Sequence, residues 1–192
     1  MNSFIKSNMQ HNFIIFVIGV FALGLWLYDK EIYGDVFRFM LIALGLFWFI
    51  QKQFQPLKYL IIIAIVILGI AFTSKLLFAY LAHHYGDIEW LQNILEIAKR
   101  PINGEFKGFP SGHTTAAFIA SALMWHFIGK KWGIFTFILA CFVGYSRILS
   151  LWHTPLQVLA GAILGFIGSF ILIYYIDKYF KKCIDKWREK KL

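Results

Sequence analysis

Long apolar stretches separated by short polar segments dominate the chain. Residues 12–28 are nearly free of charged side chains and follow a polar stretch at residues 1–11. A helix of about 20 apolar residues crosses a bilayer. By this criterion the sequence predicts six spanning helices, at residues 12–28, 36–50, 57–81, 114–128, 132–148 and 155–176. The prediction is an all-α, integral membrane six-helix bundle, forming a single domain over residues 1–192.

A shorter segment at residues 88–99 has a different pattern. Its apolar residues recur at helical spacing on one face, at Ile88, Leu91, Ile94, Leu95 and Ala98. The segment is too short and too polar to span a bilayer. We therefore expect a short interfacial helix, lying along the membrane surface before the loop that carries the candidate chemistry.

Composition and charge fix the expected orientation. Hydrophobic residues make up 59% of the chain and charged residues 15%, below the roughly 25% of soluble domains. The formal net charge is +9, and lysines gather on one side of the alternating helices, including a basic tail at about residues 177–192. By the positive-inside bias that side is cytoplasmic, as are both termini. The positive charge is therefore explained by the orientation of the helices in the membrane, and a nucleic-acid partner is not expected. No obligate protein partner is evident from the sequence.

Two cysteines, Cys141 in an apolar run and Cys183 in the basic tail, fall in different environments. A disulfide between them is not expected. No cysteine–histidine spacing predicts a structural zinc site.

Polar residues also cluster at the outer ends of the predicted helices. They form three blocks, which are Lys99-Arg100-Pro101, Gly108 to Thr114, and Ser146-Arg147 followed by His153. Ser111 and Gly112 stand where a loop enters a helix, whose unpaired N–H groups and positive dipole end suit an anion. Arg100 and Arg147 carry planar forks that match phosphate oxygens. The blocks predict a phosphate site.

Two histidines could act as catalytic groups at this site. A neutral histidine can attack phosphorus and a second can protonate the leaving oxygen, and His113 and His153 are available for these roles. The chain must turn just before the sixth span. Thr154 fits the N-cap of that helix and Pro155 its first position. Gln157 lies one turn further on and can reach back towards His153.

These residues carry a family resemblance. They are similar to the three-part signature of the type-2 phosphatidic acid phosphatase superfamily at Arg100-Pro101, Pro110-Ser111-Gly112-His113, and Ser146-Arg147 with His153. The resemblance covers about residues 99–165 and the six-helix layout. It implies His153 as the nucleophile that forms a phosphohistidine and His113 as the general acid. It also implies no metal or cofactor, and a set of phosphate-holding groups at Arg100, Ser111, Gly112 and Arg147.

Two positions depart from the family pattern. Asn93 stands where the family has a lysine, and Lys75, near the outer end of the third span, is a candidate replacement. Lys75 could equally be a lysine that reaches to the interface, and Lys99 is a weaker candidate. Gln157 stands where most members have an aspartate that orients the nucleophile. Glutamine can still accept a hydrogen bond from an imidazole N–H.

The resemblance implies dephosphorylation of a membrane lipid, without a metal ion, at the outer face of the inner (plasma) membrane, with the site facing the periplasm or exterior. Some relatives that act on polyprenyl pyrophosphates or on sugar phosphate resemble this chain at Gln157, which favours a pyrophosphate-type lipid, with undecaprenyl pyrophosphate as the first substrate. Lipid A phosphatase and phosphatidylglycerophosphate phosphatase are alternatives, as is a lipid phosphotransferase that uses the same site. The non-enzyme alternative is a phospholipid-binding or transport protein.

Overall fold

The computed structural model describes the backbone of residues 2–189 and the side chains of residues 11–179. Its helical elements are α1 (Asn2–Tyr28), α2 (Lys30–Phe37), α3 (Met40–Ile50), α4 (Phe54–Tyr85), α5 (Glu89–Leu95), the short 3₁₀ helix η1 (Glu96–Ala98), α6 (Gly112–Phe127), α7 (Lys130–Leu149) and α8 (Pro155–Glu189). No strand occurs in this range, so the all-α prediction is confirmed. The predicted tail lies mostly beyond the described side chains.

Five stretches of the described residues are long and apolar enough to cross a membrane. They are His11–Tyr28, Lys30–Ile50, Phe54–Tyr85, Lys130–Leu149 and Pro155–Tyr179. Large apolar side chains such as Phe16, Leu23 and Phe72 point outward from them. A surface of this kind suits lipid, as expected of a membrane protein. With 16 residues, α6 is shorter than these stretches.

The region predicted as one span at residues 36–50 is divided. Asp29 caps α2, because its side chain accepts hydrogen bonds from the backbone N–H groups of Glu31 and Ile32. Helix therefore begins earlier than predicted, and it is interrupted at Arg38 and Phe39 before α3 starts. Arg38 stands at this interruption and lines a cavity.

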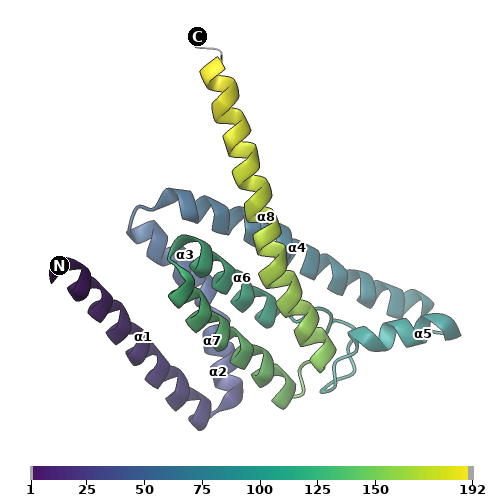
Figure 1. Ribbon diagram of the computed structural model, residues 1–192. Helices are drawn as coiled ribbons and strands as arrows, with labels where there is room; N and C mark the ends of the chain where they lie inside the picture. Colours follow the sequence, from purple (N-terminus) through teal and green to yellow (C-terminus); the bar gives the residue numbers. More distant parts are fainter. Residues whose placement is uncertain (1, 190–192) are drawn as a thin grey trace.

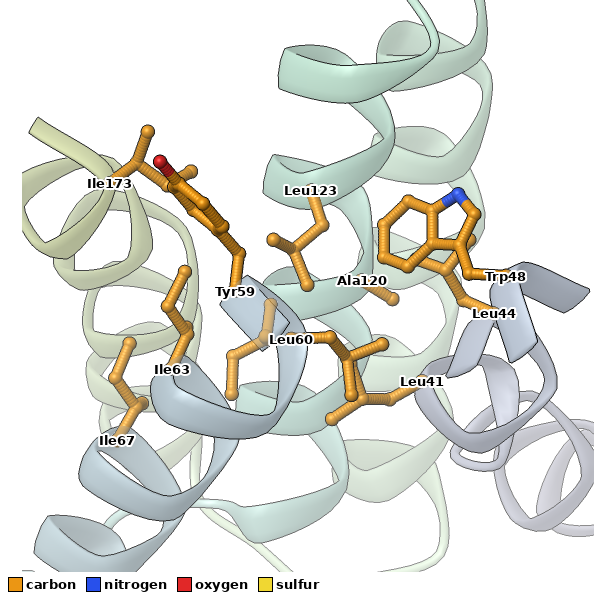
Figure 2. Packing of buried hydrophobic residues seen from close by; sticks show 11 residues of the cluster. Leu41, Leu44, Trp48, Tyr59, Leu60, Ile63, Ile67, Ala120, Leu123 and Ile173 are labelled. Carbon is orange, nitrogen blue, oxygen red and sulfur yellow. The ribbon is translucent and has the colours of Figure 1, made fainter. Parts of the chain in front are cut away.

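Helix α6 forms the centre of the bundle and packs against α3, α4, α7 and α8. Ala117, Ile119, Ala120 and Leu123 on α6 are fully buried. Figure 2 shows one of the two core clusters, in which side chains from α3, α4 and α8 surround α6. The other cluster joins α1 and α2 to α6 and α7. Helix α6, which is shorter than the five apolar stretches, is thus surrounded by other helices of the bundle.

Small residues let α8 approach α6 closely. A Cβ atom at Gly161 would lie 2.7 Å from the carbonyl oxygen of Ser111, a distance that real Cβ atoms do not adopt. Such close approach is typical of helix pairs in membranes. The result is that the starts of α6 and α8 and the end of α7 lie at the same end of the bundle (Figure 1).

Candidate active site

A cavity of about 390 Å³ opens at this end of the bundle. Its walls come from α2, α4, α6, α7 and the loops between α5 and α6 and between α7 and α8. The lining residues are Glu31, Asp35, Arg38, Lys75, Arg100, Gly112, His113, Arg147, Trp152 and His153. Four cationic side chains therefore face two carboxylates and two histidines, an excess of positive charge that suits an anionic ligand.

The loop before α8 positions His153. Thr154 caps α8, because its hydroxyl accepts a hydrogen bond from the N–H of Gln157 at 3.3 Å. The Gln157 side chain reaches back and accepts one from the N–H of Thr154 at 3.2 Å. This reciprocal pair is a capping box. It confirms the predicted turn at Thr154 and Pro155, and it holds His153 directly ahead of the helix.

Gln157 also sets the tautomer of His153. Its amide nitrogen donates to the carbonyl oxygens of Ile97 and Lys99, each at 2.9 Å. Since both amide N–H groups are used, the other atom must be the oxygen, and it lies 3.0 Å from His153 Nδ1. The proton then sits on Nδ1, and Nε2 keeps a free lone pair. That is the form in which a histidine attacks phosphorus.

Burial also keeps His153 neutral. The ring is 4% exposed. The pKa of His153 is lowered to about 4, chiefly by burial and also by the positive charges of Lys75 and Arg100, while the hydrogen bond to Gln157 acts in the opposite direction. At neutral pH the side chain is therefore an uncharged nucleophile.

A test of this arrangement is Gln157→Glu, which places a carboxylate next to His153. A glutamate cannot donate to the carbonyls of Ile97 and Lys99, so two buried acceptors would face a negative charge. We expect a loss of about 1–3 kcal/mol for each lost donor in the free energy of unfolding. We also expect a higher pKa of His153. Thermal unfolding measures the first and the pH profile the second.

The same experiment needs a variant that removes the oxygen as well. Gln157→Leu loses both functions of the amide, so its activity should fall further than its stability alone explains. If Gln157→Glu were as stable as the wild type, the hydrogen bonds of the amide nitrogen would not hold the loop.

His113 occupies the first turn of α6. Its Nε2 lies 2.9 Å from Arg38 Nη1 and 3.2 Å from Asp35 Oδ1. A protonated Nε2 can donate only to Asp35, and a deprotonated one can accept only from Arg38. Both protonation states of His113 therefore have a partner. Such surroundings suit a group that gives up a proton during a reaction.

Arg147 is held at the base of the cavity and is 3% exposed. Its Nη1 donates to Asp35 Oδ1 at 2.9 Å, and its Nη2 lies 3.7 Å from Glu31 Oε1. Its backbone oxygen accepts a hydrogen bond from the N–H of His153 at 3.1 Å. Arg147 thus links the wall formed by α2 to the histidine.

Arg100 and Lys75 form the opposite wall. Both donate to the backbone oxygen of Lys107, Lys75 at 3.0 Å and Arg100 at 3.5 Å. Arg100 also stacks on the ring of Trp152, with 5.5 Å between its carbon Cζ and the ring centre. Of the two lysines considered as replacements for the missing one, Lys75 lines the cavity together with Arg100. Lys99 instead pairs with Glu96 at 2.7 Å.

Ser111 and Gly112 differ in their placement. Gly112 lines the cavity at the start of α6. Ser111 is fully buried, its hydroxyl accepts a hydrogen bond from the Thr114 hydroxyl at 3.0 Å, and its N–H donates to the carbonyl oxygen of Gln157. Neither Ser111 nor Gln157 is among the residues that line the cavity, and both tie the start of α6 to that of α8.

Three buried guanidinium nitrogens lack a hydrogen-bond partner among residues 11–179. They are the Nε atoms of Arg38, Arg100 and Arg147, all in residues that line the cavity. A buried donor without a partner is costly unless a ligand supplies the acceptor. Three such donors around one cavity indicate an anion site. No group of three or more potential metal ligands occurs in the described part of the chain.

Sequence reasoning missed four lining residues, Glu31, Asp35, Arg38 and Trp152. Charge spacing offered a partial signal, because Asp35 and Arg38 are three residues apart and pair across one helical turn at 3.6 Å. No local pattern brings them to His113 and Arg147, which lie far along the chain.

Helix α2 reaches Arg147 only because residue 34 is a glycine. A Cβ atom there would collide with the Ser146 hydroxyl and lie 3.5 Å from Arg147 Cζ. Gly34→Ala should therefore push α2 away from α7, at a cost of about 1–3 kcal/mol, and lower activity. Thermal unfolding in detergent measures the first effect.

The matched control is Gly24→Ala in α1, where a Cβ atom would meet nothing within 4 Å. The double variant Gly34→Ala/Ser146→Ala removes the colliding hydroxyl and should recover part of the stability that Gly34→Ala loses. Equal stability of Gly34→Ala and Gly24→Ala would contradict the close contact.

Comparisons with known proteins identify the family of this chain. The family model of the PAP2 superfamily matches residues 78–181, which contain all three sequence blocks. The chain is 30% identical over 138 residues to the lipid A 4'-phosphatase of Helicobacter pylori, and 30% identical over 137 residues to the bacitracin transport permease protein BcrC of Bacillus licheniformis. These matches cover 72% and 71% of this chain, and 66% of each relative.

A solved structure shares the fold. The crystal structure of Aquifex aeolicus LpxE superposes with a TM-score of 0.58 at 23% identity, covering 76% of this chain and 86% of that one. With more than half of its length matched by the family model, the chain belongs to the PAP2 superfamily.

Proposed function

We propose that this protein dephosphorylates a membrane lipid phosphate or pyrophosphate, without a metal ion, through a phosphohistidine on His153. The observation that carries the proposal is the Gln157 amide, whose fixed orientation leaves Nε2 of His153 unprotonated beside a cationic cavity. A lipid-binding or transport protein would need the cations but not a histidine held in this tautomer. The lipid A 4'-phosphatase among the relatives supports the same class of reaction.

The reaction has two steps. Nε2 of His153 attacks phosphorus, the bond to the leaving oxygen breaks, and its electron pair goes to that oxygen together with a proton from His113. Arg100, Arg147 and Gly112 stabilise the charge on the phosphate oxygens during the transfer. Water then attacks the phosphohistidine, gives its proton to His113, and releases inorganic phosphate while His153 regains its lone pair.

Lys75 takes the place of the lysine that the family has at position 93. Its ammonium group meets Arg100 at the Lys107 carbonyl and lines the cavity, whereas Asn93 is exposed on α5. A point charge at this position adds to the attraction for phosphate and lowers the pKa of His153.

This role predicts a shift in pH dependence. Removing the positive charge by Lys75→Ala raises the pKa of His153 above about 4, so more of the nucleophile is protonated at a given acidic pH. The acid limb of the profile of kcat/KM should therefore move to higher pH, with a loss of activity at every pH. Comparison on one substrate removes the contribution of the substrate's own ionisation.

Lys99→Ala is the control, because Lys99 pairs with Glu96 and does not line the cavity. If the acid limb of the kcat/KM profile of Lys75→Ala lay at the same pH as that of the wild type, Lys75 would have no role in the site.

The proposed orientation has six spans, with α6 as the short central one, both termini in the cytoplasm, and α5 along the outer surface. The lysines at residues 130 and 131, at the start of α7, support a cytoplasmic position for the turn between α6 and α7. The cavity, at the opposite ends of these helices, then faces the periplasm or exterior of the inner membrane. Accessibility of a single cysteine introduced at Lys130 or at Glu105 to an impermeant reagent tests this topology.

Undecaprenyl pyrophosphate is the first proposed substrate, because glutamine at position 157 resembles polyprenyl pyrophosphate phosphatases of the family. A phosphate of lipid A is the second, and the 30% identity to a lipid A 4'-phosphatase favours it. The test is phosphate release by the purified protein from undecaprenyl pyrophosphate, lipid A and phosphatidylglycerophosphate, with a chelator present. Release is expected from at least one lipid. Release that requires added metal would refute the mechanism, and no release from any lipid would refute the function.

A further inference from the structure

Arg38 belongs to none of the three sequence blocks, yet it reaches the reacting groups. It follows the last residue of α2, where its backbone N–H donates to the carbonyl oxygen of Gly34. Its Nη1 lies 2.9 Å from Nε2 of His113, and its Nε is buried without a hydrogen-bond partner. The side chain is 40% exposed, so it stands at the mouth of the cavity rather than in the core.

The cations of the cavity divide into two groups. Arg100 and Lys75 meet at the Lys107 carbonyl, and their charges act on His153. Arg38 stands on the other side and contacts His113. A phosphate attacked by His153 therefore has Arg100 and Lys75 near it, while Arg38 lies beside the group that protonates the leaving oxygen.

Asp35 marks the point where the donors on this side converge. Its Oδ1 lies 2.9 Å from Arg147 Nη1, 3.2 Å from His113 Nε2 and 3.6 Å from Arg38 Nη1. Donors from three separate elements thus surround one anionic oxygen. A phosphate oxygen at this point would meet the same donors, and the half-exposed Asp35 carboxylate can turn to solvent.

We propose that Arg38, with the donors around Asp35, forms a second phosphate subsite that binds the leaving-group phosphate of a lipid diphosphate. The inference rests on the proposed function and adds a selectivity to it. When His153 attacks the terminal phosphorus, the bond to the bridging oxygen breaks and the electron pair stays on that oxygen. His113 supplies its proton, and the product that leaves is a lipid monophosphate.

Only a diphosphate places charge beside Arg38. Its leaving group keeps a phosphate that gains electron density in the transition state, and a guanidinium fork stabilises that charge. A lipid monophosphate instead loses a neutral alcohol, which gains nothing from an arginine. Arg38 therefore stabilises one transition state more than the other, which is the basis of selectivity.

The test compares undecaprenyl diphosphate with undecaprenyl monophosphate in detergent micelles, because the two share one lipid chain. For Arg38→Met, the ratio of kcat/KM for the diphosphate to that for the monophosphate should fall by about 10-fold to 100-fold. Arg38→Lys keeps the charge without the fork and should lose less. Turnover of the monophosphate reports that each variant is folded.

Lys30→Met is the matched control, since it removes a positive charge from the exposed start of the same helix and does not line the cavity. Its ratio should equal that of the wild type. An equal loss on both lipids in Arg38→Met, or a wild type active on the monophosphate alone, would overturn the subsite and leave the phosphatase standing. A wild type that releases phosphate from neither lipid and from no other in the panel would overturn the function itself.

Discussion

Replacing His153 by alanine is expected to lower phosphate release by roughly 10³-fold or more, the scale of loss when a covalent nucleophile is removed. Among residues 11–179, no other side chain offers a lone pair held by Gln157 beside the cavity cations. The loss should appear in kcat, because binding by Arg100 and Arg147 survives. Steady-state and single-turnover release from the preferred lipid measure it.

Trapping the covalent intermediate identifies the nucleophile directly. Wild-type protein mixed briefly with a lipid labelled at the terminal phosphate and then denatured should retain label in an acid-labile, base-stable bond, the behaviour of phosphohistidine. His153→Ala should retain none, and the control His84→Ala, at the exposed end of α4, should retain it as the wild type does. Label that persists in His153→Ala would place the nucleophile elsewhere.

The second large effect is expected for His113→Asn, with a size that depends on the leaving group. A general acid contributes about 10²-fold to 10⁴-fold when the leaving oxygen needs a proton. An alkyl phosphate should lose this whole factor. A p-nitrophenyl phosphate, whose leaving oxygen is stable as an anion, should lose much less, and its turnover also shows that the variant is folded.

His153→Ala gives the contrasting pattern, because the nucleophile is needed whatever leaves. Its losses on the alkyl and aryl substrates should be alike. If His113→Asn also lost the same factor on both substrates, His113 would be needed for binding rather than for proton transfer.

Much of the fold follows from apolar runs alone. Each predicted helical segment contains helix, although the one at residues 36–50 is interrupted at Arg38 and Phe39. The start of α8 follows from Thr154 and Pro155, since capping depends on residues a few positions apart. The break between α2 and α3 was missed because the run at residues 36–50 shows no glycine or proline there. The Asp29 cap starts the helix before residue 36, and the helix is interrupted where Arg38 lines the cavity. The apolar pattern of residues 36–50 indicates neither feature.

The residues of the three sequence motifs could be predicted to form the site. The residues that α2 contributes to the cavity wall could not. His113, Arg100, Arg147 and His153 carry recognisable spacing, and the structure brings them to one cavity. Asp35 meets Arg147 across 112 positions of the chain. Such a contact depends on how α2 packs against α7, and no local period in the sequence encodes it.

The amide of Gln157 has a consequence for how this site can change over evolutionary time. Its nitrogen serves the carbonyls of Ile97 and Lys99 while its oxygen serves His153. An aspartate at this position could not donate to those carbonyls as the amide does, so another donor would have to replace the amide nitrogen. A change from glutamine to aspartate at position 157 is therefore coupled to the loop that contains Ile97 and Lys99, and the site is weakened unless that loop changes as well.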